Sequence, residues 1–597
     1  LQSLEADLFE TRLEIANRMH AADGNSQLIT PVHATNRDML DQAEEAVEKI
    51  FTKVLELRGQ ISGEHGIVIT KISYLSDKKI AALREYKQSV DPNNVINPGK
   101  LMHKDTEVAP FSISWDRLIE SVSSLELPEK SELVDLLKHI QICTRCGKCK
   151  QVCPMYYPQK GYLYHPRNKN MVIGSMLAAL AFIQQTHRST RQELLTQLRE
   201  LMGFCTACGK CMDVCPVKID SAGVTLSLRS YLEQEGVTGN PWKSRVLQLW
   251  SHDSELLPWA AKAAALGQPI HNTALRCIPP FWRRRMKNPV FQGPGPKLGM
   301  TNIYQKINLS DGNLIIPGDL SEKAEVPGVF YFPGCGSGLF DAGIGLAGLF
   351  LLLESGYAVL LPEEHKCCGY PLLSEGCLET YNHTKDRNRQ FFQERINLAR
   401  EEHVHIQTLL TSCGTCRASM EHHGLEELSP SIELMDVFQF LLPQLQGERH
   451  QKKESEAVLY HSSCHSAWSD VPQKGADTSY AHSLEQCLSS QVDITPYCCA
   501  ESGLGALTAP SVYNKLRRRK RTVLQENIGQ NGEKTALLVS CPSCKIGLNR
   551  IMGSLPNKAK VQHTLEHLAD RLHGKHWKDR FAERLKKEWT QQRISPV

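Results

Sequence analysis

Eight of the 21 cysteines stand in two strings of the same spacing. The strings CTRCGKCKQVCP and CTACGKCMDVCP begin at Cys143 and Cys205 and follow the pattern CxxCxxCxxxCP. In bacterial proteins thiolates with this spacing bind a pair of 4Fe-4S clusters, and the fourth cysteine of each string ligates the other cluster. The sequence therefore predicts two 4Fe-4S clusters, with tetrahedral zinc as the alternative. The predicted ligand sets are Cys143, Cys146, Cys149 and Cys215 for one cluster, and Cys205, Cys208, Cys211 and Cys153 for the other.

A second duplication places five cysteines in each of two later segments. The first set is Cys335, Cys367, Cys368, Cys413 and Cys416, and the second is Cys464, Cys498, Cys499, Cys541 and Cys544. Corresponding cysteines are 129, 131 and 128 residues apart, which indicates an internal repeat. Soft thiolates in this number favour further iron-sulfur clusters, and zinc is again the alternative.

Apolar runs lead into these later cysteines. GVFYFPGC and AVLYHSSC precede the first cysteine of each set, and IQTLLTSC and TALLVSC precede the last pair. Helical stretches at 346–355 and 386–399 lie between the strand-like runs of the first segment. Each segment is therefore expected to be an α/β unit with its thiols at the carboxyl ends of parallel strands.

Composition excludes several classes of protein. Lys and Arg total 69 against 65 for Asp and Glu, and a formal net charge of +4 over 597 residues is too small for a nucleic-acid-coating surface. Clustered CxxC and CC groups disfavour ordinary disulfides, and the chain opens without a basic and apolar leader sequence. The apolar region 343–361 is interrupted by Glu354 and Ser355 and predicts a buried helix and strand. We expect a cytoplasmic protein, with at most peripheral contact at the inner face of the membrane.

The first hundred residues carry three ordered motifs: HAADGN from His20, ISGEHGI from Ile61 and DPNNVINPGK from Asp91. Together they resemble the C-terminal domain of FAD-linked oxidases of the vanillyl-alcohol oxidase type, the family of D-lactate, glycolate and D-2-hydroxyglutarate dehydrogenases. The resemblance implies FAD as cofactor and a 2-hydroxy acid as substrate. The family holds FAD mostly through an N-terminal domain, so we expect this chain, which begins at Leu1, to be a fragment of a longer protein.

The same resemblance implies roles for residues at the matching positions. His65 would be the base for the substrate hydroxyl, and its ordinary pKa lies near working pH. His20 and Glu64 would hold a divalent metal that grips the acid, although Gln27 stands where the family has a second histidine. The positions next to the flavin would be Gly63, Gly66 and Asn97.

The cysteine-rich parts resemble known modules as well. The two strings with their long helical spacer resemble the alpha-helical ferredoxin module of multi-centre dehydrogenases. The later sets resemble the cysteine-rich CCG domain of heterodisulfide reductase, anaerobic glycerol-3-phosphate dehydrogenase and the iron-sulfur subunit of glycolate and lactate oxidases. In the second set CCG becomes CCA at Ala500.

These observations predict a multidomain protein of α/β and α+β class. The expected parts are 1–105, the C-terminal part of an FAD-linked oxidase domain; 106–130, a linker; 131–235, the ferredoxin domain; 236–325, a connecting region; 326–447 and 455–575, the two CCG domains; and 576–597, a tail.

The expected function is oxidation of a 2-hydroxy acid at FAD, with single electrons relayed through 4Fe-4S clusters to a quinone or protein acceptor. A non-catalytic electron-transfer subunit is one alternative, and an anaerobic glycerol-3-phosphate dehydrogenase or heterodisulfide-reductase-like enzyme is another. No nucleic-acid partner is expected, and a homo-oligomer is compatible with the sequence.

Overall fold

The computed structural model divides into two compact units, residues 1–141 and 142–597, which are described separately. The residues it describes are 13–32, 37–62, 66–67, 69–96, 119, 130–156, 164–183, 188–237, 239, 241–252, 256–286, 288–291, 298–309, 312–320, 325–428, 430–447, 457–466, 479–501, 506, 509–528 and 535–594.

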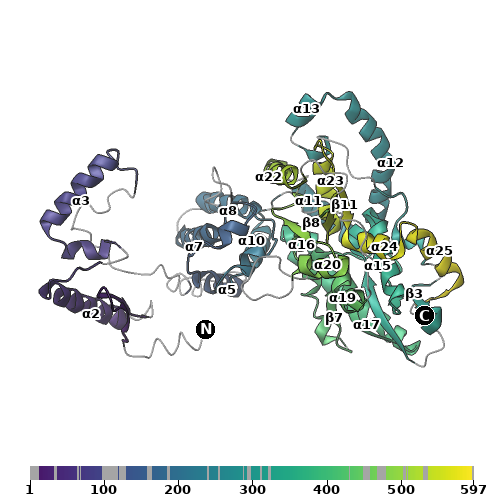
Figure 1. Cartoon of the computed structure of the whole chain (residues 1–597), viewed down its shortest axis with the longest axis horizontal. Helices are drawn as coiled ribbons and strands as arrows, with labels where there is room; N and C mark the ends of the chain where they lie inside the picture. The colour runs from purple at the N-terminus through teal and green to yellow at the C-terminus, as the bar shows by residue number, and fades with distance from the viewer. Residues whose placement is uncertain are drawn as a thin grey trace. The chain divides into compact units, whose positions relative to one another are not determined.

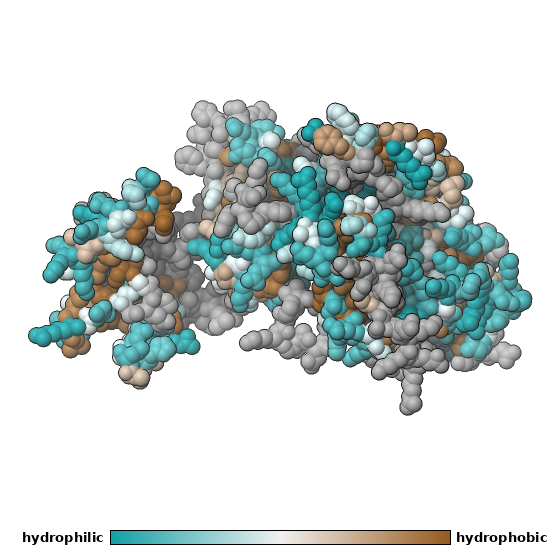
Figure 2. Space-filling model, turned by 45° about the horizontal axis from the view of Figure 1, so that its top comes forward, coloured by the Kyte–Doolittle hydropathy of each residue, from teal (hydrophilic) through white to brown (hydrophobic). Residues whose placement is uncertain are grey.

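The first unit contains one hairpin and several helices (Figure 1). Its elements are β1 (Ala16–His20), β2 (Asn25–Ile29), α2 (Arg37–Glu56), the 3₁₀ helix η1 (Ile69–Tyr74), α3 (Asp77–Val90) and α5 (Lys130–Gln141). Helix α3 begins where the Ser76 hydroxyl accepts a hydrogen bond from the Lys79 N–H, an N-cap that satisfies one free donor of the first turn. Apolar side chains such as Leu57 and Val95 are exposed on this unit, whose surface shows brown patches in Figure 2.

The second unit opens with a helical module around the two cysteine strings. Its helices are α6 (Cys149–Val152), α7 (Pro166–Ile183), α8 (Arg188–Gly203), α9 (Lys210–Asp213) and α10 (Ser221–Gln234). Asp220 caps α10 by accepting from the N–H groups of Ala222 and Gly223. The long helices α7 and α8 occupy the spacer between the strings, as its composition predicts.

Further helices lead from this module to the sheets. They are α11 (Pro241–His252), α12 (Leu256–Cys277), α13 (Pro280–Arg285), η2 (Pro289–Phe291) and α14 (Ile303–Lys306). Among the described residues, no helix is both long and apolar enough to cross a membrane.

The first cysteine-rich segment builds a six-stranded sheet in the order β12-β3-β5-β4-β6-β7. Strands β5, β4, β6 and β7 are parallel, whereas at one edge β3 is antiparallel to β5 and β12 is antiparallel to β3. The strands are β3 (Leu314–Pro317), β4 (Val326–Phe332), β5 (Ala358–Leu360), β6 (Val404–Thr411), β7 (Glu433–Asp436) and β12 (Trp589–Gln592). Helices of this segment are α15 (Ala342–Glu354), α16 (Tyr370–Glu375), α17 (Leu378–Glu401), α18 (Gly414–Met420) and α19 (Val437–Gly447).

The second segment repeats the parallel part of this sheet. Its order, β9-β8-β10-β11, corresponds to β5-β4-β6-β7 of the first. The strands are β8 (Ala457–His461), β9 (Val492–Thr495), β10 (Thr535–Val539) and β11 (Lys560–His563). The helices are α20 (Tyr480–Leu488), α22 (Pro510–Ile528), α23 (Pro542–Met552), α24 (Thr564–His573) and α25 (Trp577–Lys587). The predicted α/β class, with cysteines after parallel strands in both segments, is confirmed.

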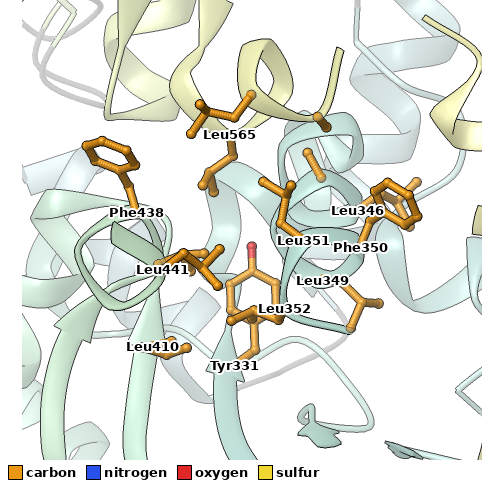
Figure 3. Packing of buried hydrophobic residues seen from close by; sticks show 14 of the residues in the cluster. Tyr331, Leu346, Leu349, Phe350, Leu351, Leu352, Leu410, Phe438, Leu441 and Leu565 are labelled. Atoms are coloured by element: carbon orange, nitrogen blue, oxygen red, sulfur yellow. The ribbon is translucent and has the colours of Figure 1, made fainter. Parts of the chain in front are cut away.

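The two segments share their hydrophobic cores. One core joins Tyr331 and Phe350 of the first segment to Tyr460, Tyr480 and Leu565 of the second. Figure 3 shows Leu565 facing the leucines of α15, with Tyr331 beneath them. Because neither sheet buries this face alone, the duplicated segments form one structural body.

Two strands from outside the predicted CCG domains extend the first sheet. Strand β3 lies in the predicted connecting region, and β12 lies in the predicted tail, yet both extend the first sheet. Trp589 of β12 is buried in the shared core, so the last part of the chain belongs to the cysteine-rich body.

Candidate metal centres

The two cysteine strings fold into loops with the same backbone pattern. Arg145 and Ala207 have φ of 55° and 50°, and Gly147 and Gly209 have φ of 75° and 71°. Left-handed residues in such turns direct successive backbone N–H groups into a concave surface that suits an anion. Both loops are therefore shaped for a negatively charged group between their thiols.

Thiols from both strings meet at one cavity. Cys153 of the first string lines it together with Cys205, Cys208 and Cys211 of the second. Burial raises the pKa of Cys153 to about 11, which favours the protonated thiol. A bound metal would keep this thiol deprotonated. Four soft donors around one cavity fit an iron-sulfur cluster.

The first string brings three thiols together. Burial raises the pKa of Cys149, and the nearby Cys143 and Cys146 contribute in the same direction. Cys215, the predicted fourth ligand, lies two residues after α9 and donates its N–H to the Met212 carbonyl at 3.1 Å. The assignment of Cys215 to this cluster stays a prediction.

A buried lysine beside the cavity was missed in the sequence. Lys169 is 3% exposed, and its Nζ donates to the Phe204 carbonyl at 2.9 Å. Burial alone would raise the pKa of Cys205, but the charges of Lys169 and Arg229 lower it below its usual value. Lys169 lies on α7, away from both strings in sequence, so the spacing of the cysteines does not reveal it.

The first centre, defined as the five cysteines of the first segment, gathers at one edge of its sheet. Cys335 follows β4, the pair Cys367 and Cys368 follows β5, and Cys413 and Cys416 follow β6. These strands are adjacent and parallel, so their carboxyl ends meet.

Thiol–thiol hydrogen bonds link the first centre into a chain. The thiol of Cys335 hydrogen-bonds with that of Cys367, Cys367 with Cys368, Cys368 with Cys416, and Cys416 with Cys413. The bonds from Cys335 and Cys368 hold the pKa of Cys367 well below its usual range. Cys367 thus favours the thiolate form that binds metals, whereas the same interactions raise the pKa of Cys335 and Cys368.

The second centre, defined as the five cysteines of the second segment, repeats this chain and adds a histidine. The thiol of Cys464 hydrogen-bonds with that of Cys498, Cys498 with Cys499, Cys499 with Cys544, and Cys544 with Cys541. His461 also hydrogen-bonds with Cys499. Burial lowers the pKa of His461 to about 4, which keeps its imidazole neutral.

A lysine is buried beside the second centre. Lys520 is 0% exposed, and its Nζ donates to the carbonyls of Thr495 and Pro496 and to the Thr495 hydroxyl, at 2.7 to 3.0 Å. These bonds anchor the chain just before Cys498. The sequence places Lys520 in the basic run LRRRKR, which suggests a solvated face, but it lies in the buried stripe of α22 formed by Tyr513, Leu516, Lys520, Leu524 and Ile528. That helical spacing is the signal that could have identified it.

The two centres meet at corresponding cysteines of the repeat. The Sγ atoms of Cys413 and Cys541 are 3.9 Å apart. A side chain at Gly414 would collide with the His465 carbonyl, and one at Gly336 would come within 2.6 Å of Pro542. The CxxC turn of each centre therefore packs against the loop that carries the first cysteine of the other centre.

The dicluster cavity also touches the second centre. Cys208 is hydrogen-bonded to Cys464, and Lys210 Nζ donates to the Ser462 carbonyl at 2.9 Å. The Tyr370 hydroxyl donates to the Ala207 carbonyl at 2.9 Å and lies 3.0 Å from His465 Nε2. Thiols thus follow one another from the dicluster module through the second centre to the first.

Buried charges hold the helical module against the first segment. Glu375 of α16 pairs with Arg199 of α8 at 3.0 Å and with Lys243 of α11. Arg229 of α10 donates to the carbonyls of Ser374 and Cys205, at 2.7 and 2.9 Å. These contacts fix the cavity relative to the two centres.

The predicted flavin-site residues are described only in part. His20 ends β1 and pairs with Asn25 of β2, and Arg18 pairs with Gln27, so the side chains of His20 and Gln27 share one face of the hairpin. Gly66 adopts φ 73° and its carbonyl accepts from the Ser62 hydroxyl at 2.7 Å. The predicted residues Gly63, Glu64, His65 and Asn97 lie outside the described residues.

Comparison with protein families gives matches to three kinds of domain along the chain. Residues 1–101 match the C-terminal domain of FAD-linked oxidases, and residues 139–219 match the 4Fe-4S dicluster domain. Residues 329–421 and 458–549 each match the cysteine-rich domain named CCG.

Curated relatives match different parts of the chain. Glycolate oxidase subunit GlcD of Bacillus subtilis is 40% identical over 90 residues, which is 14% of this chain and 19% of that protein. A fumarate reductase (CoM/CoB) subunit of Methanothermobacter marburgensis is 21% identical over 417 residues, covering 68% of this chain and 67% of the relative. A dihydromethanophenazine:CoB–CoM heterodisulfide reductase subunit of Methanosarcina barkeri is 22% identical over 343 residues, covering 55% of this chain and 69% of the relative. No solved structure matches the chain.

The chain spans about a fifth of the length of GlcD and about two thirds of the two methanogen proteins. The matches agree with the thiol geometry and with the flavin-oxidase motifs. The chain therefore joins a C-terminal domain of FAD-linked oxidases, a 4Fe-4S dicluster domain and two cysteine-rich CCG domains.

Proposed function

We propose that the protein oxidises a 2-hydroxy acid, such as D-lactate, glycolate or D-2-hydroxyglutarate, and passes the electrons one at a time to a quinone or protein acceptor. The first unit supplies part of the flavin site, and the second unit supplies the iron-sulfur relay. Bound FAD would supply a two-electron acceptor, and bound clusters would supply one-electron carriers.

The observation that carries the proposal is the continuous series of thiols in the second unit. Cys208 contacts Cys464 at one end of the second centre, and Cys541 at its other end lies 3.9 Å from Cys413 of the first. Electron transfer weakens steeply with distance, so adjacent centres with touching ligands suit a relay. The proposed order is dicluster, second centre, first centre.

The proposed ligands are those of the sequence analysis. One cluster would use Cys153, Cys205, Cys208 and Cys211, which line one cavity, and the other Cys143, Cys146, Cys149 and Cys215. The two later centres would hold iron-sulfur clusters, with zinc as the alternative.

The proposed chemistry at the flavin end rests on the family resemblance of the first unit. His65 would accept the proton of the substrate hydroxyl, and His20 with Glu64 would hold a divalent metal against the carboxylate. Gly63, Gly66 and Asn97 would lie next to the flavin.

The test is anaerobic reduction of the full-length protein by a panel of 2-hydroxy acids, followed at flavin and cluster wavelengths. Bleaching of both chromophores by one acid supports the proposal. Cluster reduction by dithionite together with no flavin absorbance favours the electron-transfer subunit.

A second candidate is thiol or disulfide chemistry at the paired cysteine-rich centres. It is favoured by the match to a heterodisulfide reductase subunit and by the contact between Cys413 and Cys541. Reductive cleavage of a small disulfide by the dithionite-reduced protein, without any reaction towards 2-hydroxy acids, would favour this candidate.

A further inference from the structure

The second centre differs from the first at the end of one strand. His461 ends β8 three residues before Cys464, and Phe332 ends β4 three residues before Cys335. The repeat offset of 129 residues aligns these two positions. The second centre therefore has an imidazole where the first has a phenyl ring.

The imidazole lies among the thiols of its centre. One nitrogen of His461 and the Sγ atoms of Cys499 and Cys544 all lie within 4.8 Å of one another. In the part of the chain that the structure describes, no other three ligand atoms from histidine, cysteine or carboxylate side chains lie so close together. A metal ion held at about 2.0–2.1 Å from nitrogen and about 2.3 Å from sulfur requires ligand atoms at this kind of separation.

The imidazole has little else to bind. His461 is 1% exposed, and within the described residues its Nδ1 has no hydrogen-bond partner. A buried polar atom without a partner is costly, and a metal ion would satisfy one ring nitrogen while Cys499 stays close to the ring.

From this geometry we infer that His461, together with Cys499 and Cys544, ligates one metal ion of the second centre. The ligand set of the second centre is then mixed nitrogen and sulfur, whereas the first centre uses sulfur alone. The metal is an iron of an iron-sulfur cluster or a zinc ion, since both accept imidazole and thiolate.

The mixed ligand set has a consequence for electron flow. A neutral imidazole carries no negative charge, whereas a thiolate carries one. Replacing cysteines by histidines accordingly raises the reduction potential of a 2Fe-2S centre. If the second centre holds iron, it is therefore more easily reduced than a centre ligated by sulfur alone. The inference rests on the proposed metal centre and not on the identity of the substrate.

The experiment compares anaerobically purified full-length protein with three variants. His461→Phe copies Phe332 of the first segment, and His461→Cys restores a soft ligand without nitrogen. His365→Phe is the matched control, because His365 is also buried beside a thiol pair yet belongs to no group of three ligand atoms among the described residues.

The readout is nitrogen coordination. Pulsed paramagnetic resonance with ¹⁵N-histidine labelling detects imidazole on iron, and X-ray absorption at the zinc edge detects it on zinc. We expect a nitrogen signal in the wild type and in His365→Phe, and its loss in both His461 variants. For iron, we also expect a lower midpoint potential of this centre in His461→Cys.

Other results overturn the inference. A sulfur-only shell in the unsubstituted protein would do so without any variant, and so would an unchanged nitrogen signal in the His461 variants. Absence of any metal in the second segment would overturn both this inference and the proposed centre, whereas metal with sulfur alone would leave the relay intact.

Discussion

The residue after each adjacent cysteine pair adopts a left-handed backbone. Gly369 has φ 81° and Ala500, at the aligned position, has φ 61°. A left-handed conformation costs an L-residue about 1–2 kcal/mol, a cost that glycine does not bear. The change from CCG to CCA therefore leaves strain in the second centre.

Ala500→Gly is expected to stabilise the second unit by at most about 0.5 kcal/mol, since the relief of strain is partly offset by the added freedom of the unfolded chain and by the loss of a buried methyl group. Gly369→Ala is expected to destabilise it by about 1–3 kcal/mol, because the new Cβ would lie 2.8 Å from the Tyr381 ring. Unfolding midpoints of both variants at matched iron content check this pair. Shifts of the same sign would contradict it.

The sequence predicts residues well where chemistry imposes a spacing. Spacing identifies eighteen cysteines as candidate ligands, and the structure gathers the ten of the two later centres at sheet edges. Spacing gives no role to Lys169, His461 or Lys520, because each is a single polar residue whose burial depends on tertiary packing. Only the stripe of α22 carried a local signal for one of them.

At the scale of elements, glycines permit the two centres to touch. Gly414 begins α18 where the backbone of Cys464 and His465 passes, and no side chain fits there. The approach of these two segments accompanies the contact of Cys413 with Cys541.

Gly414→Ala is expected to separate the segments and slow reduction of the first centre at least several-fold, while the dicluster signal is retained. Gly267→Ala is the matched control, since a Cβ there meets nothing within 4 Å. Rapid-freeze paramagnetic resonance after addition of dithionite measures the order of reduction. Equal rates in both variants would refute the role of this close approach.

Alternation of apolar runs and cysteines was enough to predict the parallel strands of both segments. It was not enough for β3 and β12, which have four residues each. These two strands pair with each other although they lie far apart along the chain. Such edge strands carry little pattern of their own, and their pairing is decided by the sheet they join.

At the scale of the whole second unit, one carboxylate joins the helical module to the sheets. Glu375 and its partner Arg199 have side chains that are 8% and 9% exposed, and Lys243 completes the cluster. Removing one member of a buried ion pair leaves the other charge uncompensated, at a cost of about 3–5 kcal/mol.

Glu375→Gln is therefore expected to destabilise the second unit by about 3 kcal/mol, since the amide still accepts one hydrogen bond. Hydrogen exchange in α8 and α16 should increase before the rest of the unit unfolds. Glu583→Gln, which breaks an exposed pair with Lys587, should leave stability nearly unchanged because solvent screens that pair. Equal effects of the two substitutions would argue against this role of Glu375.

The contact between the dicluster module and the second centre could not be predicted from the sequence. Cys208 and Cys464 are far apart along the chain, and no motif relates them. Their proximity is a product of packing between domains, and it is what converts separate cysteine motifs into a candidate relay.

The most direct test of the relay is freeze-quench paramagnetic resonance of the full-length, anaerobic protein mixed with D-lactate, glycolate or D-2-hydroxyglutarate. We expect one of these acids to reduce the dicluster first and the two later centres next. Clusters that respond to dithionite but to none of the acids would contradict it.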